Sequence, residues 1–285
     1  MKSLDTFNKE IVSVIVPTFN SESSLYKCLK AIRDQTYLKL EVLVVDNYSR
    51  DKTRHIAESE GAKVLLFGGT QAAARNFGLS SSKGQYVLFV DSDQQLEARV
   101  VEECVKICVS DGVDAVIIPE VFVGLAFWGQ SSAFWKNGVN KALGENGGIP
   151  RFYNRDVFLK LLPFNDQLRY WEDQELHQRL KAAGVKEARC RSFVLHYESG
   201  SLQDVTRKYL SYGRSVAAFE ESADNAPYIL TVKTTLSSLF EVLKNPGCSL
   251  RLLFGFSFLF LLKSLCAAFG FLSYSRFFLF SAFIK

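Results

Sequence analysis

Two aspartates separated by one residue follow a short apolar run. Residues 86–90 (YVLFV) are typical of a buried strand, and Asp91-Ser92-Asp93 comes directly after them. Residues two apart in an extended segment point to the same side, so we expect Asp91 and Asp93 to present their carboxylates together. Paired carboxylate oxygens suit Mg²⁺ or Mn²⁺, which take further ligands from a diphosphate. The alternative is a strand-end turn with solvated acids, since Asp and Ser are common turn residues.

Polar side chains also follow two other predicted strands. They are Pro17, Thr18 and Asn20 after the apolar run 11–16, and Asp46 after the run 41–45. The first group would either shape a nucleotide pocket or form only a strand-to-helix turn. Asp46 would either accept a hydrogen bond from a ribose or nucleobase or cap its own turn.

The segment 68–78 (GGTQAAARNFG) combines a glycine-rich backbone, a helix start and Arg75. A helix N-terminus with a cation nearby favours phosphate. The alternative is an ordinary connection that carries a surface arginine.

The elements that must position these residues alternate along the chain. Apolar runs predict strands at 11–16, 41–45, 63–67, 86–90, 114–118 and 188–196. Helical spacing predicts helices at about 21–32, 53–60, 70–79, 100–108, 156–162, 173–183 and 202–221. Buried strands alternating with helices indicate a Rossmann-like, doubly wound and mostly parallel α/β sheet. Ligands bind beyond the carboxyl ends of such strands, so the polar clusters are expected to meet in one crevice.

Several classes of protein are disfavoured. The chain has 285 residues, of which 48% are hydrophobic and 22% charged, so it can bury a sizeable core. Neither G-x-G-x-x-G after the first strand nor G-x-x-x-x-G-K-[ST] occurs, which disfavours a dinucleotide dehydrogenase and a P-loop NTPase. None of the six cysteines forms a C-x-x-C pair, and Cys104 and Cys108 fall one helical turn apart in an apolar pattern. This favours core packing and a reducing, cytoplasmic compartment.

The C-terminal part differs from the rest in charge and hydropathy. Residues 236–285 hold five basic residues and one acid, which accounts for the whole net charge of +4. The segment 252–272 is almost wholly apolar, with Lys263 near its middle. It is long enough to cross a bilayer, and two shorter helices at the membrane surface, split near Lys263, fit as well. A buried helical layer is the third possibility. Basic residues beside apolar runs favour binding to an anionic membrane over binding to nucleic acid. We expect the preceding domain to lie on the cytoplasmic side of that membrane.

Several motifs together resemble those of a known family. SVIVPTFNSESSLYKCLKAIRDQ, EVLVVDNYSRDKT, QAAARNFGL and YVLFVDSDQQ are similar, in this order, to family 2 glycosyltransferases of the GT-A fold. LLPFNDQLRYWEDQELHQRLKAAG resembles a later block of that family, and FVLHYESG and RKYLSYGRS resemble its late His and Tyr-Gly-Arg elements. The resemblance covers about 11–215. It implies a catalytic domain over 1–215, with a nucleotide-binding half over 1–122 and an acceptor half over 123–215, followed by a helical, membrane-associated segment over 216–285.

The resemblance also implies roles for individual residues. The donor is a nucleotide-diphosphate sugar, transferred with inversion, and Mg²⁺ or Mn²⁺ is the cofactor. The nucleotide would be lined by Pro17, Thr18, Asn20, Asp46, Arg75 and Asp91. The metal would lie near Asp91, Asp93 and His196, and the diphosphate or acceptor near Gln95, Glu172, Arg207 and Arg214. Asp173 would be the general base, although it could instead be a helix N-cap, and His196 could instead be a half-buried strand residue. The family's Q-x-x-R-W motif is absent, and Tyr212-Gly213-Arg214 stands where it is expected.

Two kinds of acceptor are compatible with these residues. The order Asp91, Asp93, Gln95 resembles polyprenyl-phosphate sugar synthases. Glu172-Asp173 favours a hydroxyl of a lipid-linked glycan or other surface glycoconjugate, because a phosphate acceptor is already ionised and needs no base. A sugar-nucleotide-binding membrane module without catalysis is a further alternative. The aromatic, glycine-rich region 122–151 is expected to be a variable lid or binding region rather than a regular element, and to supply the sugar pocket.

Overall fold

The structure is a computed structural model that describes residues 10–144, 147–161, 163–222, 241, 243–244 and 249–282. The chain divides into two compact units, which are considered separately. The first unit comprises Met1–Val121, Gly148–Asp166 and Leu176–His196, and the second comprises Phe122–Gly147, Gln167–Glu175 and Tyr197–Lys285.

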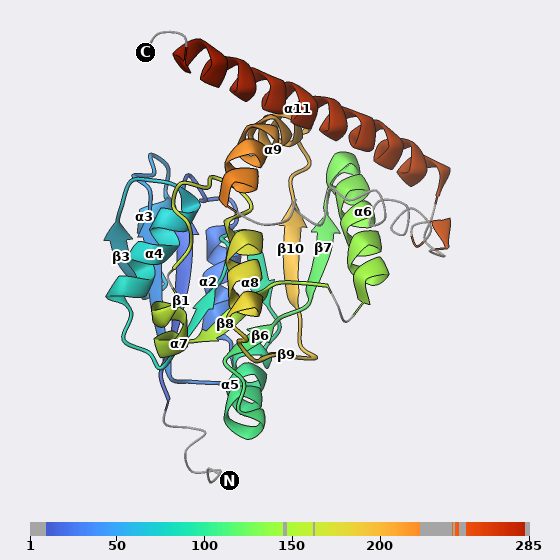
Figure 1. Cartoon of the computed structure of the whole chain (residues 1–285). Helices are drawn as coiled ribbons and strands as arrows, with labels where there is room; N and C mark the ends of the chain where they lie inside the picture. Colours follow the sequence, from blue (N-terminus) through green and yellow to red (C-terminus); the bar gives the residue numbers. More distant parts are fainter. Residues whose placement is uncertain are drawn as a thin grey trace. The chain divides into compact units, whose positions relative to one another are not determined.

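A seven-stranded sheet forms the centre of the first unit, in the order β3-β2-β1-β4-β8-β6-β9 (Figure 1). The strands are β1 (Val12–Thr18), β2 (Leu40–Asp46), β3 (Lys63–Leu66), β4 (Tyr86–Phe89), β6 (Ala115–Ile117), β8 (Pro150–Asn154) and β9 (Glu187–Arg189). Strands β3, β2, β1 and β4 pair in parallel, whereas β8 is antiparallel to both β4 and β6. The mostly parallel α/β sheet is therefore confirmed, and the insertion of β8 makes it mixed.

The helices of this unit follow the predicted spacing. They are α2 (Leu25–Arg33), α3 (Thr53–Ser59), α4 (Gln71–Ser81), α5 (Val100–Asp111) and α7 (Arg155–Lys160), with most of α8 (Glu172–Ala182). All seven residues of β1 are buried, as its continuous β-branched run predicts. Cys104 and Cys108 are buried in the core on α5, which confirms their packing role. Helix α4 starts at an N-cap, Thr70, whose side-chain oxygen accepts from the backbone nitrogen of Ala73 at 3.1 Å.

Two predicted elements differ in the structure. The predicted strand 188–196 is two strands, β9 and β10 (Val194–Glu198). Strand β10 leaves the large sheet and pairs antiparallel with β5 (Gln94–Leu96), which directly follows the Asp-Ser-Asp triplet. The residues at the end of β4 are thereby brought next to β10.

The second unit is mainly helical. Its helices are α6 (Phe127–Leu143), α9 (Leu202–Ser222) and α11 (Leu250–Ala282), and α11 packs against both others. The region 122–151 is thus not the irregular lid that we predicted, since α6 occupies most of it. At the contact of α6 with α11, a Cβ added to Gly255 would lie 2.1 Å from Ser131 Oγ, so only glycine allows this approach.

Helix α11 runs unbroken through the segment 252–272, so the alternative of two shorter helices split near Lys263 is wrong. In the described part of the chain, no helix combines the length and apolar composition needed to cross a bilayer. Lys263 is 8% exposed, and its ammonium lies 3.1 Å from Ser132 Oγ of α6. The exposed side of α11 carries apolar side chains three or four residues apart: Phe254, Phe258, Leu261, Leu265 and Phe269.

Candidate active site

The Asp-Ser-Asp triplet is a turn. The backbone nitrogen of Gln94 donates to the carbonyl of Asp91 at 2.9 Å, and residues 92–93 have turn conformation. The expectation of an extended segment is therefore wrong, and the alternative of a strand-end turn is confirmed for the backbone. Asp91 hydrogen-bonds Arg75 and Gln71, whereas Asp93 pairs with His196.

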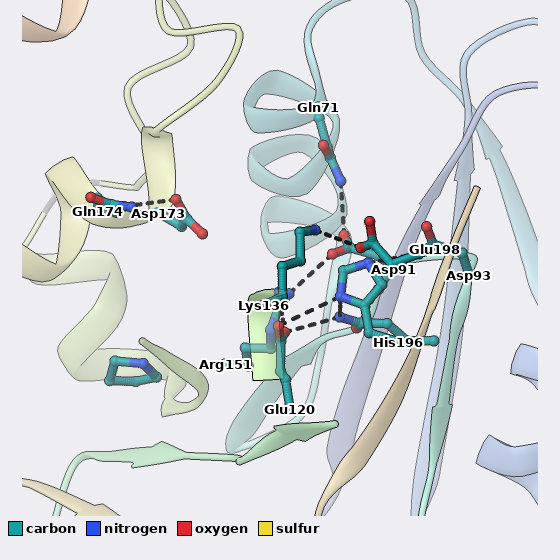
Figure 2. A network of polar contacts seen from close by, with 12 residues as sticks. Gln71, Asp91, Asp93, Glu120, Lys136, Arg151, Asp173, Gln174, His196 and Glu198 are labelled. Carbon is teal, nitrogen blue, oxygen red and sulfur yellow. Dashed lines mark hydrogen bonds and ion pairs between the residues drawn. The ribbon is translucent and has the colours of Figure 1, made fainter. Parts of the chain in front are cut away.

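Asp91 is held by cations and an amide (Figure 2). Its Oδ1 accepts from Arg75 Nη2 at 2.7 Å and from Gln71 Nε2 at 2.8 Å, and its Oδ2 lies 3.2 Å from Arg151 Nη1. Burial raises the pKa of Asp91, but Arg75, Arg151 and His196 outweigh burial and hold the pKa well below its usual range. Asp91 is thus a fixed anion.

Arg75 was predicted to face a phosphate, but its guanidinium pairs with Asp91. The side chain is 5% exposed, pairs with Asp91, and lies 5.3 Å from the centre of the Phe164 ring. In this arrangement Arg75 fixes the carboxylate of Asp91.

Asp93 faces His196 of strand β10. The side chain of Asp93 is 47% exposed, and its Oδ1 lies 3.5 Å from His196 Nε2. On the other side of the imidazole, Nδ1 lies 3.5 Å from Glu120 Oε2, and Glu120 Oε1 binds Arg151 at 2.6 Å. Burial lowers the pKa of His196, but Asp93 and Glu120 raise it to about 9. Figure 2 shows this network of alternating acids and bases.

Asp93 and His196 are two candidate donors for a divalent cation. A histidine that ligates a metal through Nε2 carries its proton on Nδ1, and a carboxylate there fixes that tautomer; Glu120 occupies this place. Among the described residues, no three His, Cys, Asp or Glu side chains form a metal-binding group. Asp93 and His196 would therefore supply two protein ligands, and Mg²⁺ or Mn²⁺ characteristically completes its shell with water and substrate phosphates.

Gln94 rather than Gln95 belongs to this network. Gln94 Oε1 accepts from the backbone nitrogen of Asp91 at 3.0 Å, and its Nε2 lies 3.1 Å from Glu120 Oε1 and 3.2 Å from His196 Nδ1. Successive residues of strand β5 point to opposite faces, so Gln95 projects away from these groups. Our assignment of Gln95 to the diphosphate or acceptor is not supported by this geometry.

Asp46 is buried at the end of β2 and binds the neighbouring loops. It accepts from Thr18 Oγ1 at 3.1 Å and from the backbone nitrogen of Ser49 at 2.9 Å. Since Asp46 is 0% exposed, it holds these loops in place and does not present its carboxylate to solvent. Pro17 and Thr18 are likewise buried beside it.

Two loops at the ends of β1 and β2 are joined around Asn20. Its backbone nitrogen donates to Ser49 Oγ at 2.8 Å, and its side-chain oxygen accepts from the backbone nitrogen of Arg50 at 2.9 Å. Asn20 and Tyr48 both have positive φ, at 50° and 52°. The side chains of Phe19 and Tyr48 remain 61% and 59% exposed. Both rings are therefore available for contact with a flat ligand ring.

In the second unit, Asp173 lies in the first turn of α8. The helix begins at Glu172, so Asp173 is inside it and the N-cap alternative is wrong. Its Oδ1 accepts from the backbone nitrogen of Gln174 at 2.8 Å, while its side chain is only partly buried. Glu172 is 5% exposed. The partly exposed Asp173 is the better placed of the two for proton transfer.

The other predicted residues of this unit are on α9. Arg207 is 67% exposed and pairs with Asp204 at 3.2 Å. The side chain of Arg214 lies outside what the structure describes. Their assignment to the diphosphate or acceptor stays a prediction.

Sequence reasoning missed Arg151, Glu120, Gln71 and Gln94. Arg151 lies on the antiparallel strand β8, and Glu120 begins β7 (Glu120–Gly124). Neither stands in a recognisable motif, and the pairing of β8 with β4 that brings Arg151 to Asp91 is a tertiary feature. Nothing in the sequence points to Gln94 as a site residue until the turn at residues 92–93 is known.

Comparison with known proteins agrees with this fold. The family model described as Glycosyl transferase family 2 matches residues 13–166, more than half of the chain. Glycosyltransferase AglE of Haloferax volcanii is 39% identical over 114 residues, which are 37% of this chain and 38% of that protein. The poly(ribitol-phosphate) β-N-acetylglucosaminyltransferase TarS of Staphylococcus aureus is 33% identical over 115 residues, 37% of this chain and 20% of TarS. The chain thus spans less than two fifths of the length of these relatives.

Solved structures show the same fold at low identity. TarS 1–349 in complex with UDP-GlcNAc superposes with a TM-score of 0.56 at 21% identity, covering 75% of this chain and 68% of that one. The mannosyltransferase PcManGT of Pyrobaculum calidifontis, in complex with GDP-Man and Mn²⁺, superposes with a TM-score of 0.56 at 20% identity, covering 96% and 80%. The fold is the GT-A-like α/β fold, and the chain belongs to glycosyl transferase family 2.

Proposed function

We propose that the protein transfers a sugar from a nucleotide-diphosphate sugar, with inversion, to a hydroxyl of a lipid-linked glycan or other surface glycoconjugate. The observation that carries this proposal is the contact of Asp93 with His196 at the end of β4, beside the fixed anion Asp91. This donor set suits a metal-bound diphosphate, and the complex of PcManGT with GDP-Man and Mn²⁺ is consistent with it.

Each group has a distinct task in this reaction. Asp93 and His196 would hold Mg²⁺ or Mn²⁺, which when bound neutralises the charge that builds up on the departing nucleoside diphosphate. Arg75 and Arg151 hold Asp91 in place as an anion beside the nucleotide. Asp173 takes the proton from the attacking hydroxyl, a contribution of about 10²–10⁴-fold.

Of the two acceptor classes, the hydroxyl is better supported. The resemblance to polyprenyl-phosphate sugar synthases depended partly on Gln95, and Gln94 is the residue that contacts Asp91 and Glu120. Asp173, partly exposed in the first turn of α8, gives a hydroxyl acceptor the base that it requires.

A panel of UDP- and GDP-sugars, supplied with Mg²⁺ or Mn²⁺, tests the proposal through release of nucleoside diphosphate. We expect turnover with at least one donor, abolished by EDTA and reduced about 100-fold or more in Asp93→Asn. Binding of a donor by calorimetry without release of nucleoside diphosphate, with any acceptor extract, would instead identify a non-catalytic module.

We further propose that α11 associates with an anionic lipid surface, with the catalytic domain on the cytoplasmic side. The exposed stripe from Phe254 to Phe269 is apolar, Arg251 is exposed beside its start, and 236–285 carries the basic excess. Flotation with vesicles of phosphatidylglycerol and phosphatidylcholine should recover the protein, and Phe254→Ser/Leu261→Ser/Leu265→Ser should abolish recovery. Equal recovery of both proteins would refute the stripe as the contact.

A further inference from the structure

Three lysines from three helices gather in the second unit around Tyr209, which lies on α9. Lys136 comes from α6, Lys208 from α9 and Lys263 from α11. The ammonium of Lys263 lies 4.8 Å from the centre of the Tyr209 ring. That of Lys208 lies 5.7 Å from the ring of Tyr212, one turn of α9 further on. We call these three residues the lysine cluster.

One carboxylate accompanies the cluster. Glu198 Oε1 accepts from Lys136 Nζ at 2.5 Å (Figure 2), and Glu198 Oε2 accepts from Ser132 Oγ at 2.8 Å. Ser132 in turn lies 3.1 Å from Lys263 Nζ. Ser132 therefore stands between Glu198 and Lys263, and Glu198 is engaged by Lys136.

Lys263 carries a charge that is largely withdrawn from water. It is 8% exposed, and within the described residues it forms no ion pair. Burying a charged group is costly unless an opposite charge compensates it. Burial raises the pKa of the Tyr209 hydroxyl, but Lys263, Lys136 and Lys208 outweigh burial and lower that pKa.

Aromatic rings connect the lysine cluster with the candidate base. Tyr212 lies 5.1 Å from Tyr209 and 4.9 Å from Trp171, measured between ring centres. Trp171 precedes Glu172-Asp173 and has a positive φ of 71°, which is strained for a tryptophan. It is 9% exposed, and its indole N–H has no hydrogen-bond partner within the described residues. A donor of this kind and the flat rings beside it suit a sugar-like acceptor.

We propose that the lysine cluster binds a phosphate group carried by the acceptor. This inference rests on the proposed function: the reactive hydroxyl is at Asp173, and the phosphate is held by Lys263 with Lys136 and Lys208 on the other side of Tyr212. The acceptor is therefore a phosphorylated glycoconjugate and not a neutral glycan. A phosphodiester within a polymer and the diphosphate of a lipid carrier share this chemistry.

Direct binding to the full chain, in EDTA so that no metal-bound diphosphate contributes, tests the proposal without turnover. Inorganic phosphate, farnesyl diphosphate and oligomeric glycerol phosphate are the probes in calorimetry. We expect phosphate to bind. Farnesyl diphosphate should bind more tightly if the acceptor is a lipid-carried diphosphate, and oligomeric glycerol phosphate should do so if it is a phosphodiester polymer. Lys263→Met should weaken it about 10-fold or more, and Lys263→Arg should retain it within about 3-fold. The exposed Lys106→Met on α5 is the matched control and should bind like the wild type.

Thermal unfolding separates lost binding from misfolding. Phosphate should raise the midpoint temperature of the wild type and leave that of Lys263→Met unchanged, since only a bound ligand stabilises the fold. Without phosphate, Lys263→Met should be at least as stable as the wild type, because the uncompensated charge is gone. The acceptor site would be overturned if Lys263→Met bound phosphate as tightly as the wild type does. It would also be overturned if Lys263→Met lost as much affinity for UDP or GDP in Mn²⁺ as it loses for phosphate. Absence of turnover with every nucleotide sugar would refute the proposed function and leave these binding results standing.

Discussion

Arg75 Nη2 lies 2.7 Å from Asp91 Oδ1, and both side chains are largely withdrawn from solvent. With Arg151 on the other carboxylate oxygen, this contact makes the first aspartate of the Asp-Ser-Asp turn a fixed structural anion. Asp93, 47% exposed, is the aspartate that we propose as the metal ligand. Two residues of one short motif therefore have different tasks, which substitution can separate.

Asp91→Asn should destabilise the protein, whereas Asp93→Asn should not. Losing the Asp91 charge leaves Arg75 and Arg151 partly uncompensated in a buried site, at a cost of about 3–5 kcal/mol. Asp93 is half exposed, so its change should stay within about 0.5 kcal/mol. Urea unfolding measures both. Titration of Mn²⁺ followed by electron paramagnetic resonance should show weakened binding for Asp93→Asn. Equal destabilisation by the two substitutions would contradict the assigned roles.

Glu120→Gln should weaken Mn²⁺ binding although Glu120 need not touch the metal. Glu120 faces His196 Nδ1 at 3.5 Å, and losing such a carboxylate partner lowers metal affinity by about 10–100-fold. The same resonance titration measures this effect. Glu58→Gln, on the exposed side of α3, is the control and should bind as the wild type does. An unchanged Mn²⁺ affinity in Glu120→Gln would show that the carboxylate does not position the imidazole.

The regular parts of the first unit were predictable because a local pattern specifies them. The strand 12–18 is a β-branched run that is buried throughout, and α2 buries Leu25, Cys28, Leu29 and Ile32 at helical spacing. Arg151 and Glu120 were not predictable, since only strand pairing brings β8 and β7 to the end of β4.

Helix α6 was missed because its glycines suggested an irregular segment. Gly129 lies where a Cβ would be 3.0 Å from the carbonyl of Glu198 and 3.3 Å from Gly124 Cα. The glycine therefore serves close backbone packing within the helix rather than ending it. Such an approach depends on partners distant in the sequence, so no local pattern indicates it.

Gly78→Ala tests the packing of α4 on the sheet. An added Cβ would lie 2.5 Å from Ile15 Cγ2 and 3.1 Å from Val45 Cγ2, and both neighbours are fully buried. Overpacking costs about 1–3 kcal/mol, offset by up to about 1 kcal/mol from the better helix propensity of alanine. We expect a net loss of about 1–2 kcal/mol in the free energy of unfolding. Ser80→Ala, exposed on the same helix, should change it by less than about 0.5 kcal/mol. A stabilised Gly78→Ala would contradict the close contact.

Asp173→Asn should abolish transfer while preserving donor binding. The amide cannot take a proton from an acceptor hydroxyl, so kcat for transfer should fall by about 10²–10⁴-fold. Calorimetry with the nucleotide sugar and Mn²⁺ should give an unchanged Kd, because the residues proposed to bind the donor belong to the first unit. The fold should persist, since an asparagine oxygen can still accept from the backbone nitrogen of Gln174. Asp156→Asn, in the first turn of α7, is the matched control and should keep full activity. Full transfer by Asp173→Asn would point to an acceptor that is already ionised, as a polyprenyl phosphate is.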